Sequence, residues 1–142
     1  MKKTKLLVEH HYEFELLGIV APLKDYKMAW VINNSLGVKL TKSRDFELEF
    51  LNQPNLLISQ FALEKEHGFI QLLRNRSLSP VDQALYLVPE LKIMDYFLLL
   101  QDMTFEMNIN TYIEALSDNQ YIQNVVKLEV SKLKSKENLL TY

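Results

Sequence analysis

The sequence YFLLL at residues 96–100 is a continuous apolar run, and the segments around it decide the fold. Extended to 94–101, such a run is typical of a central strand with both faces buried. Apolar residues at positions i, i+3, i+4 and i+7 over 109–116 predict a helix, and alternation over 126–130 predicts a strand. These elements form a strand–helix–strand unit over 95–131. If its two strands are parallel in one sheet, the crossover should be right-handed.

The sequence before this unit predicts a first strand and a first helix. Alternating apolar and polar residues indicate a strand at 12–20 with one buried face. Helical spacing over 23–35 places Tyr26 and Trp30 on one side, which we expect to be the core side. Gly37 is suited to end this helix, because glycine adopts the left-handed conformation common after a helix C-terminus.

The middle of the chain is rich in strand patterns. Residues 46–50 alternate between apolar and acidic side chains, and 57–66 and 69–76 also read as strands. A short strand at 84–88 ends at Pro89, which lacks the N–H that a ladder needs.

The strands 57–66 and 69–76 are close enough to form a hairpin. Its two-residue junction lies at 67–68, where glycine tolerates positive φ. This turn would place Leu63 opposite Leu72 and Phe61 opposite Arg74.

These elements together predict the α+β class. We expect a two-layer sandwich with two main helices and a mostly antiparallel sheet of about six strands. The order is compatible with a ferredoxin-like or ACT-like core, an analogy that by itself carries no function. With no internal repeat and no evident linker, residues 1–142 are predicted to form a single domain.

Composition limits the classes of function. The net charge is −2 and the chain has no cysteine, so disulfides and thiolate sites are excluded. No stretch approaches the length of a membrane span or a secretory signal, and we expect a soluble cytoplasmic protein. Arg74 and Arg76 share one face of a predicted strand, but the negative net charge disfavours nucleic-acid binding.

The few histidines give no convincing metal site. Glu9, His11 and Glu13 would share one face of a strand, yet a zinc ion needs three or four converging ligands with supporting partners. We interpret these residues as a solvent-facing cluster and His67 as a turn residue. The sequence predicts neither a bound metal nor a cofactor.

The segment VPELKIMDY at 88–96 holds Pro89, Glu90, Asp95 and Tyr96 at a characteristic spacing. It resembles the signature of the IPExxxVDY family, a group of small, uncharacterised bacterial proteins. The first and seventh residues of the segment, Val and Met, stand where the family has Ile and Val, and both remain apolar.

The resemblance extends over the whole chain in length and order of elements. The segments LKDY at 23–26 and KSKENL at 134–139 are also similar to the family. The resemblance implies no particular reaction, ligand or partner.

The signature favours an architectural interpretation. Glu90 could accept backbone N–H groups across a turn, and Asp95 could hold a loop to a strand entrance. Tyr96 would pack while its hydroxyl finds a partner. These three residues are also the candidate binding residues. The alternative makes Glu90 and Asp95 a carboxylate pair for a metal ion or for proton transfer.

Three functions remain open. The leading hypothesis is a non-enzymatic protein-binding or adaptor domain with an unknown protein partner, with a homodimer formed through an exposed edge strand as one form of it. The second is a small-ligand sensor of ACT-like type. The third, less favoured, is an enzyme that uses Glu90 and Asp95.

Overall fold

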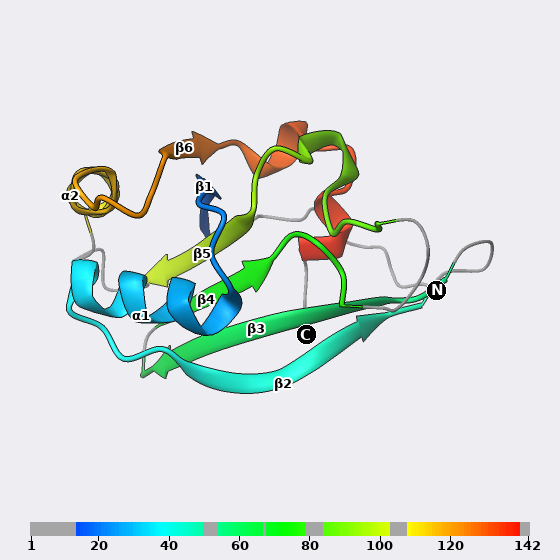
Figure 1. Cartoon of the computed structure of the whole chain (residues 1–142), viewed down its shortest axis with the longest axis horizontal. Helices are drawn as coiled ribbons and strands as arrows, with labels where there is room; N and C mark the ends of the chain where they lie inside the picture. Colours follow the sequence, from blue (N-terminus) through cyan, green and yellow to red (C-terminus); the bar gives the residue numbers. More distant parts are fainter. Residues whose placement is uncertain (1–13, 50–53, 67, 79–83, 103–107, 140–142) are drawn as a thin grey trace.

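The computed structural model describes residues 14–49, 54–66, 68–78, 84–102 and 108–139. Within them, six strands form one sheet in the order β2-β3-β4-β5-β1-β6, and every neighbouring pair is antiparallel (Figure 1). The predicted α+β architecture is confirmed. The elements are β1 (Glu15–Val20), α1 (Asp25–Leu36), β2 (Thr41–Leu48), β3 (Leu56–Lys65), β4 (Gly68–Arg74), β5 (Tyr96–Asp102), α2 (Ile109–Ser117) and β6 (Asn124–Leu128).

The strand–helix–strand unit β5-α2-β6 places its two strands on either side of β1, and β4 pairs with the other edge of β5. Both β5 and β6 are antiparallel to β1, which lies between them, so β5 and β6 are parallel to each other. β4 and β1 are likewise parallel on the two sides of β5. The four strands β6-β1-β5-β4 thus have the order and directions of a ferredoxin-like core, and β3 and β2 extend it.

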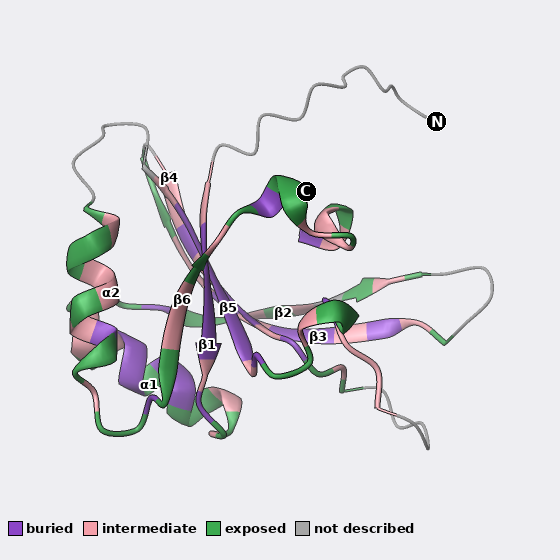
Figure 2. Ribbon diagram, turned by 90° about the horizontal axis from the view of Figure 1, so that it is seen from above, coloured by how far each residue is buried: buried purple, intermediate pink, exposed green. Residues whose placement is uncertain are grey.

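One side of the sheet, the helix face, is covered by α1 and α2 (Figure 2). Asn108 caps α2 by accepting hydrogen bonds from the N–H groups of Asn110 and Thr111. The helix face buries alternate residues of the central strands, among them Leu17, Ile19, Leu72, Tyr96, Leu98 and Leu100.

The opposite side, the loop face, is covered by irregular segments. The first is the signature loop, residues 86–95, which contains a 3₁₀ turn at Pro89–Leu91. The second is the tail, residues 130–139, with 3₁₀ turns at Val130–Lys132 and Lys136–Leu139. The core between them and the sheet includes Leu16, Leu56, Ile58, Leu73, Leu87, Val88, Phe97, Leu99, Val130 and Leu139.

The sheet has a hydrophobic core on each face, and this explains why its central strands bury side chains on both sides. The prediction that β5 is buried on both faces is confirmed. The prediction of one buried face for β1 is wrong, because Leu16, Leu17 and Ile19 are all fully buried. β1 lies between β5 and β6 with cover on both sides, so its side chains enter both cores.

The first helix forms where expected, but its core side was wrongly predicted. Gly37 ends α1 in the left-handed conformation with φ of 68°, as predicted. α1 buries Met28, Val31 and Ile32, whereas Trp30 is 54% exposed. Apolar residues lie on several sides of this helix, so spacing alone does not identify the side that faces the sheet.

Two further predictions are wrong. In the hairpin, Leu63 pairs with Ile70 and Phe61 pairs with Leu72, because Gly68 belongs to β4 and pairs with Lys65. The strand predicted at 84–88 is reduced to a single bridge between Arg76 and Tyr86. Its apolar residues pack against the loop face instead of extending a ladder.

Candidate functional site

The signature loop is organised around Asn75, a buried residue that directly follows β4. Its side-chain oxygen accepts a hydrogen bond from the Val88 N–H at 2.8 Å. Its amide nitrogen donates to the carbonyls of Leu91 and Met94, each at 2.9 Å. One amide group therefore satisfies three backbone groups of an irregular segment.

The backbone of Asn75 adds two more connections. Its N–H donates to the Asp95 carbonyl at 2.9 Å, and its carbonyl accepts from the Leu87 N–H at 2.7 Å. The sequence analysis missed this residue. An asparagine at the end of a predicted strand gives no periodic signal, and its partners lie 12 or more positions further along the chain.

Asp95 joins the signature loop to the end of β1. Its carboxylate accepts a hydrogen bond from the Ala21 N–H at 2.8 Å, and its backbone N–H donates to the Ile19 carbonyl at 2.8 Å. The sequence analysis expected Asp95 to hold the loop to a strand entrance, whereas its observed partners lie at the end of β1.

Tyr96, the first residue of β5, connects the same end of the sheet to the start of α1. Its ring is buried in the helix-face core, and its hydroxyl donates to the Leu23 carbonyl at 2.5 Å. Burial raises the pKa of Tyr96 far above its ordinary value, Asp25 and Asp95 raise it further, and Arg74 opposes the shift. The phenol therefore stays protonated and remains a donor.

Glu90 holds the tail. Its two carboxylate oxygens accept from the Ser135 N–H and the Ser135 hydroxyl, each at 2.8 Å. Partial burial raises the pKa of Glu90, but hydrogen bonds from Ser135 and neighbouring backbone outweigh it, so the pKa lies below its ordinary value of 4.5. The Asn138 amide adds a hydrogen bond to the Leu87 carbonyl at 2.8 Å.

The three signature residues thus hold three different segments. Glu90 forms hydrogen bonds with the tail, Asp95 with the end of β1, and Tyr96 with the segment that leads into α1. The two other segments that resemble the family, 23–26 and 134–139, are among those held. Both carboxylates accept backbone hydrogen bonds, an arrangement that favours the architectural interpretation over an acid–base pair.

A pocket of about 300 Å³ lies where the ends of β1 and β4 meet the start of β5. The segment before α1 forms one wall and the signature loop forms another. Asp95 and Tyr96 belong to its lining and Glu90 does not. The lining residues are Pro22, Leu23, Lys24, Arg74, Arg76, Tyr86, Lys92, Met94, Asp95 and Tyr96.

The pocket is strongly basic although the chain is acidic overall. Lys24, Arg74, Arg76 and Lys92 line it, and Asp95 is the only carboxylate in the lining. Within the described residues, none of these four cations makes an ion pair with a carboxylate. The Lys92 ammonium lies 5.7 Å from the centre of the Tyr86 ring. Sequence analysis singled out Arg74 and Arg76 but could not place them beside two lysines from other segments.

The described ranges contain neither a metal-ligand cluster nor a membrane-spanning helix. No group of three or more His, Asp or Glu side chains there could hold a metal ion. No helix of this part of the chain is long and apolar enough to cross a membrane. The cluster at 9–13 and His67 lie outside the described residues.

Comparisons with protein-family models, with curated proteins and with solved structures found no match for this chain. The resemblance to the IPExxxVDY family stays a prediction.

Proposed function

We propose that this protein is a non-enzymatic binding domain that holds a small anionic ligand in the basic pocket. The observation that carries the proposal is the set of four cations around one cavity, none paired with a carboxylate among the described residues. Like charges held together repel each other, so an anion that enters gains attraction and relieves repulsion. This function corresponds to the small-ligand sensor considered from the sequence.

The pocket's chemistry suits ligands with a phosphate or carboxylate group. Arg74 and Arg76 offer planar donor pairs that match both groups, and lysine adds a mobile point charge. Lys24 directly precedes α1, whose N-terminal end carries a partial positive charge. The volume of about 300 Å³ is at the lower end of the range of small-molecule sites.

Binding can be tested by thermal unfolding with inorganic phosphate, pyrophosphate, citrate or AMP at millimolar concentration. A ligand that binds only the folded state raises the unfolding temperature. We expect at least one probe to do so beyond a sodium chloride control of equal ionic strength. Isothermal titration calorimetry then gives its affinity.

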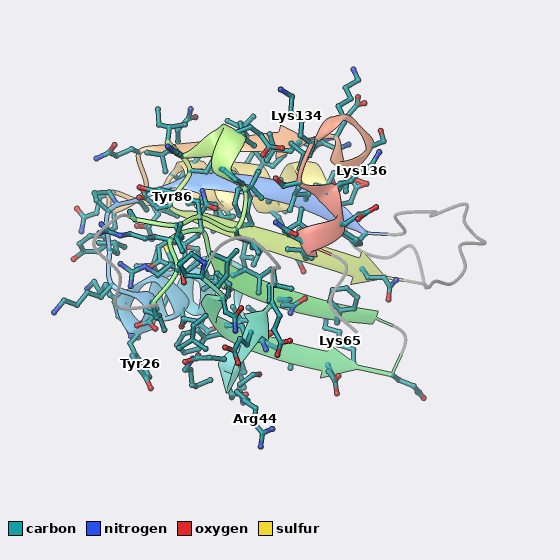
Figure 3. All side chains as sticks on the ribbon, turned by 90° about the vertical axis from the view of Figure 1, so that its right-hand side faces the viewer. Tyr26, Arg44, Lys65, Tyr86, Lys134 and Lys136 are labelled. Atoms are coloured by element: carbon teal, nitrogen blue, oxygen red, sulfur yellow. The ribbon has the colours of Figure 1, made fainter. Side chains whose placement is uncertain are left out.

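The matched pair of variants is Arg74→Ala and Arg44→Ala. Arg74 lines the pocket, whereas Arg44 lies on β2 outside it and projects from the bottom of the molecule in Figure 3, away from Tyr86. Arg74→Ala should weaken the best probe about tenfold or more, and Arg44→Ala should leave it unchanged. If no probe stabilises the protein, or both variants weaken binding equally, the proposal is wrong.

A second candidate function, protein binding, has an observation of its own. Tyr26, Trp30 and Tyr121 are 66%, 54% and 39% exposed. Trp30 and Tyr121 lie around Lys27, and Tyr26, the residue before Lys27, packs edge-on against Phe61. The Lys27 ammonium is 4.5 Å from the centre of the Trp30 ring and 4.4 Å from that of Tyr121. We call these four residues the aromatic surface. Exposed aromatic groups of this kind are enriched at protein interfaces.

The aromatic surface would serve the adaptor hypothesis, or a homodimer formed through this surface instead of through the edge strand considered from the sequence. We propose a cytoplasmic location for either form. Figure 3 places Tyr26 at the lower left of the view and the tail residues Lys134 and Lys136 in its upper part, so Tyr26 is separate from the tail. Analytical ultracentrifugation tests the homodimer: the wild type should dimerise and Trp30→Ala should not. A wild type that stays monomeric at all concentrations contradicts the homodimer.

A further inference from the structure

The signature loop lies between the basic pocket and the tail. Tyr86, Lys92, Met94 and Asp95 line the pocket. Residues between them, Leu87 and Glu90, hold the tail through Asn138 and Ser135. Figure 1 shows the ribbon of the signature loop beside that of the tail. A change in how the tail is seated therefore acts on the same ten residues that shape one wall of the pocket.

The tail is the kind of segment that can detach without global unfolding. It contains only two short 3₁₀ turns, which form few hydrogen bonds of their own. It is held by the buried side chains of Val130 and Leu139 and by the polar contacts of Ser135 and Asn138. Segments with little regular structure and few contacts open at lower free energy than central strands do.

Detachment would change the signature loop directly. The Leu87 carbonyl would lose its partner, the Glu90 carboxylate would lose both donors, and the buried side chains of Leu87 and Val88 would lose part of their cover. Asn75 would still hold the loop at its base. Lys92 and Tyr86 would then be less fixed, and a less organised site binds its ligand more weakly.

We propose that the tail is a clasp that controls the basic pocket: a docked tail holds the signature loop in the binding conformation, and a bound anion in turn holds the tail in place. This inference rests on the proposed anion-binding function. Because coupling between two sites is reciprocal, the tail must affect affinity by the same factor as the anion affects docking.

The test uses the full-length protein and pyrophosphate as the probe. Ser135→Glu places a second carboxylate against Glu90 and should release the tail, because like charges repel. Ser131→Glu is the matched control, since it adds the same charge to an exposed position of the same tail. Ser135→Ala removes only the hydroxyl contact and is used if Ser135→Glu does not fold.

We expect Ser135→Glu to weaken pyrophosphate binding about fivefold or more, and Ser135→Ala to weaken it in the same direction by less. Ser131→Glu should stay close to wild type. Without ligand, Ser135→Glu should speed amide hydrogen exchange in the signature loop, and in the wild type pyrophosphate should slow exchange in the tail.

The outcomes separate the two proposals. If the wild type binds pyrophosphate and Ser135→Glu binds it equally well, the clasp is wrong while anion binding stands. If exchange in the signature loop is unchanged in Ser135→Glu, the clasp is also wrong, whatever the ligand result. If pyrophosphate does not bind the wild type, the clasp is wrong, and so is the proposal that the basic pocket binds this anion.

Discussion

The two faces of the sheet are covered by different kinds of structure. Helices cover one face, and an irregular loop and tail cover the other (Figure 2). A helix satisfies most of its backbone hydrogen bonds internally, so packing it needs mainly apolar side chains. An irregular segment cannot do so, and its buried N–H and C=O groups need partners from elsewhere. On the loop face those partners are Asn75, Glu90 and Asn138.

This difference gives a physical account of the signature. Its polar residues lie in an irregular segment or directly beside one. Each forms a hydrogen bond with a backbone group of another segment. The helix face should tolerate volume-conserving apolar exchanges. The loop face should be sensitive to single polar side chains.

The largest expected effect is that of Asn75→Ala. The substitution leaves the Val88 N–H and the Met94 carbonyl without their partner, while the Leu91 carbonyl keeps its hydrogen bond from the Met94 N–H. At about 1–3 kcal/mol for each of these two unsatisfied buried groups, the free energy of unfolding should fall by roughly 2–6 kcal/mol. Urea unfolding followed by circular dichroism measures this loss.

The matched control for Asn75 is Asn33→Ala on α1. The Asn33 amide also bonds backbone, accepting from the Leu40 N–H at 2.8 Å and donating to its carbonyl at 3.2 Å. The site is partly exposed, so we expect a loss of about 1–2 kcal/mol. Equal losses in the two variants would remove the contrast between the faces.

Next in size is Leu139→Ala. Leu139 is 1% exposed and packs in the loop-face core, and truncating a buried leucine costs about 2–5 kcal/mol. On the proposal that the tail opens locally, we expect the loss to appear as faster hydrogen exchange in the tail and signature loop. Leu116→Ala, its counterpart in α2, should instead weaken the helix face. Faster exchange confined to α2 in Leu139→Ala would contradict this assignment.

A smaller loss is expected for Gly18→Ala in β1. A methyl group at this position would lie 2.8 Å from the Met94 sulfur and 3.0 Å from a Leu128 methyl carbon. Overpacking costs about 1–3 kcal/mol, and the flexible Met94 side chain favours the lower end. Gly37→Ala has open space around it and a φ of 68°, so its cost of about 1–2 kcal/mol comes from the backbone alone. Chemical denaturation of both variants measures the cost of steric crowding at Gly18 and the cost of the backbone conformation at Gly37 separately.

The smallest effect is the pH dependence contributed by Glu90. Its pKa is lower in the folded protein than the ordinary 4.5, so it stabilises the fold above that pH. This contribution is lost as the pH falls through the folded-state pKa. We therefore expect Glu90→Gln to be less stable than wild type at neutral pH and to approach it in stability as the pH falls below the ordinary pKa of 4.5 and through the folded-state pKa. A stability difference that grows on acidification would contradict the assigned sign.

Sequence reasoning succeeded where a single local period decides the structure. The all-apolar run in β5 and the helical spacing in α2 each have one interpretation, and both elements formed as predicted. Sequence reasoning failed where hydrogen-bonding partners are far apart in the sequence, and where several sides of a helix are equally apolar. α1 has apolar residues on several sides, so Trp30 was wrongly assigned to the core.

The candidate site shows the same division. Glu90, Asp95 and Tyr96 were recognised as a spaced set, but their partners Ser135, Ala21 and Leu23 come from other parts of the chain. The basic pocket combines residues from three separate segments, and spacing within one segment cannot reveal such a meeting.

The position of Trp30 has a practical consequence for spectroscopy. It is the only tryptophan in the chain, it is more than half exposed, and a lysine ammonium lies over its ring. Its indole emission should already be at long wavelength in the folded state, so unfolding should shift it little. A partner that covers the aromatic surface should shift the emission to shorter wavelength, while a ligand in the basic pocket should not. Intrinsic fluorescence therefore distinguishes the two proposed binding surfaces without a label.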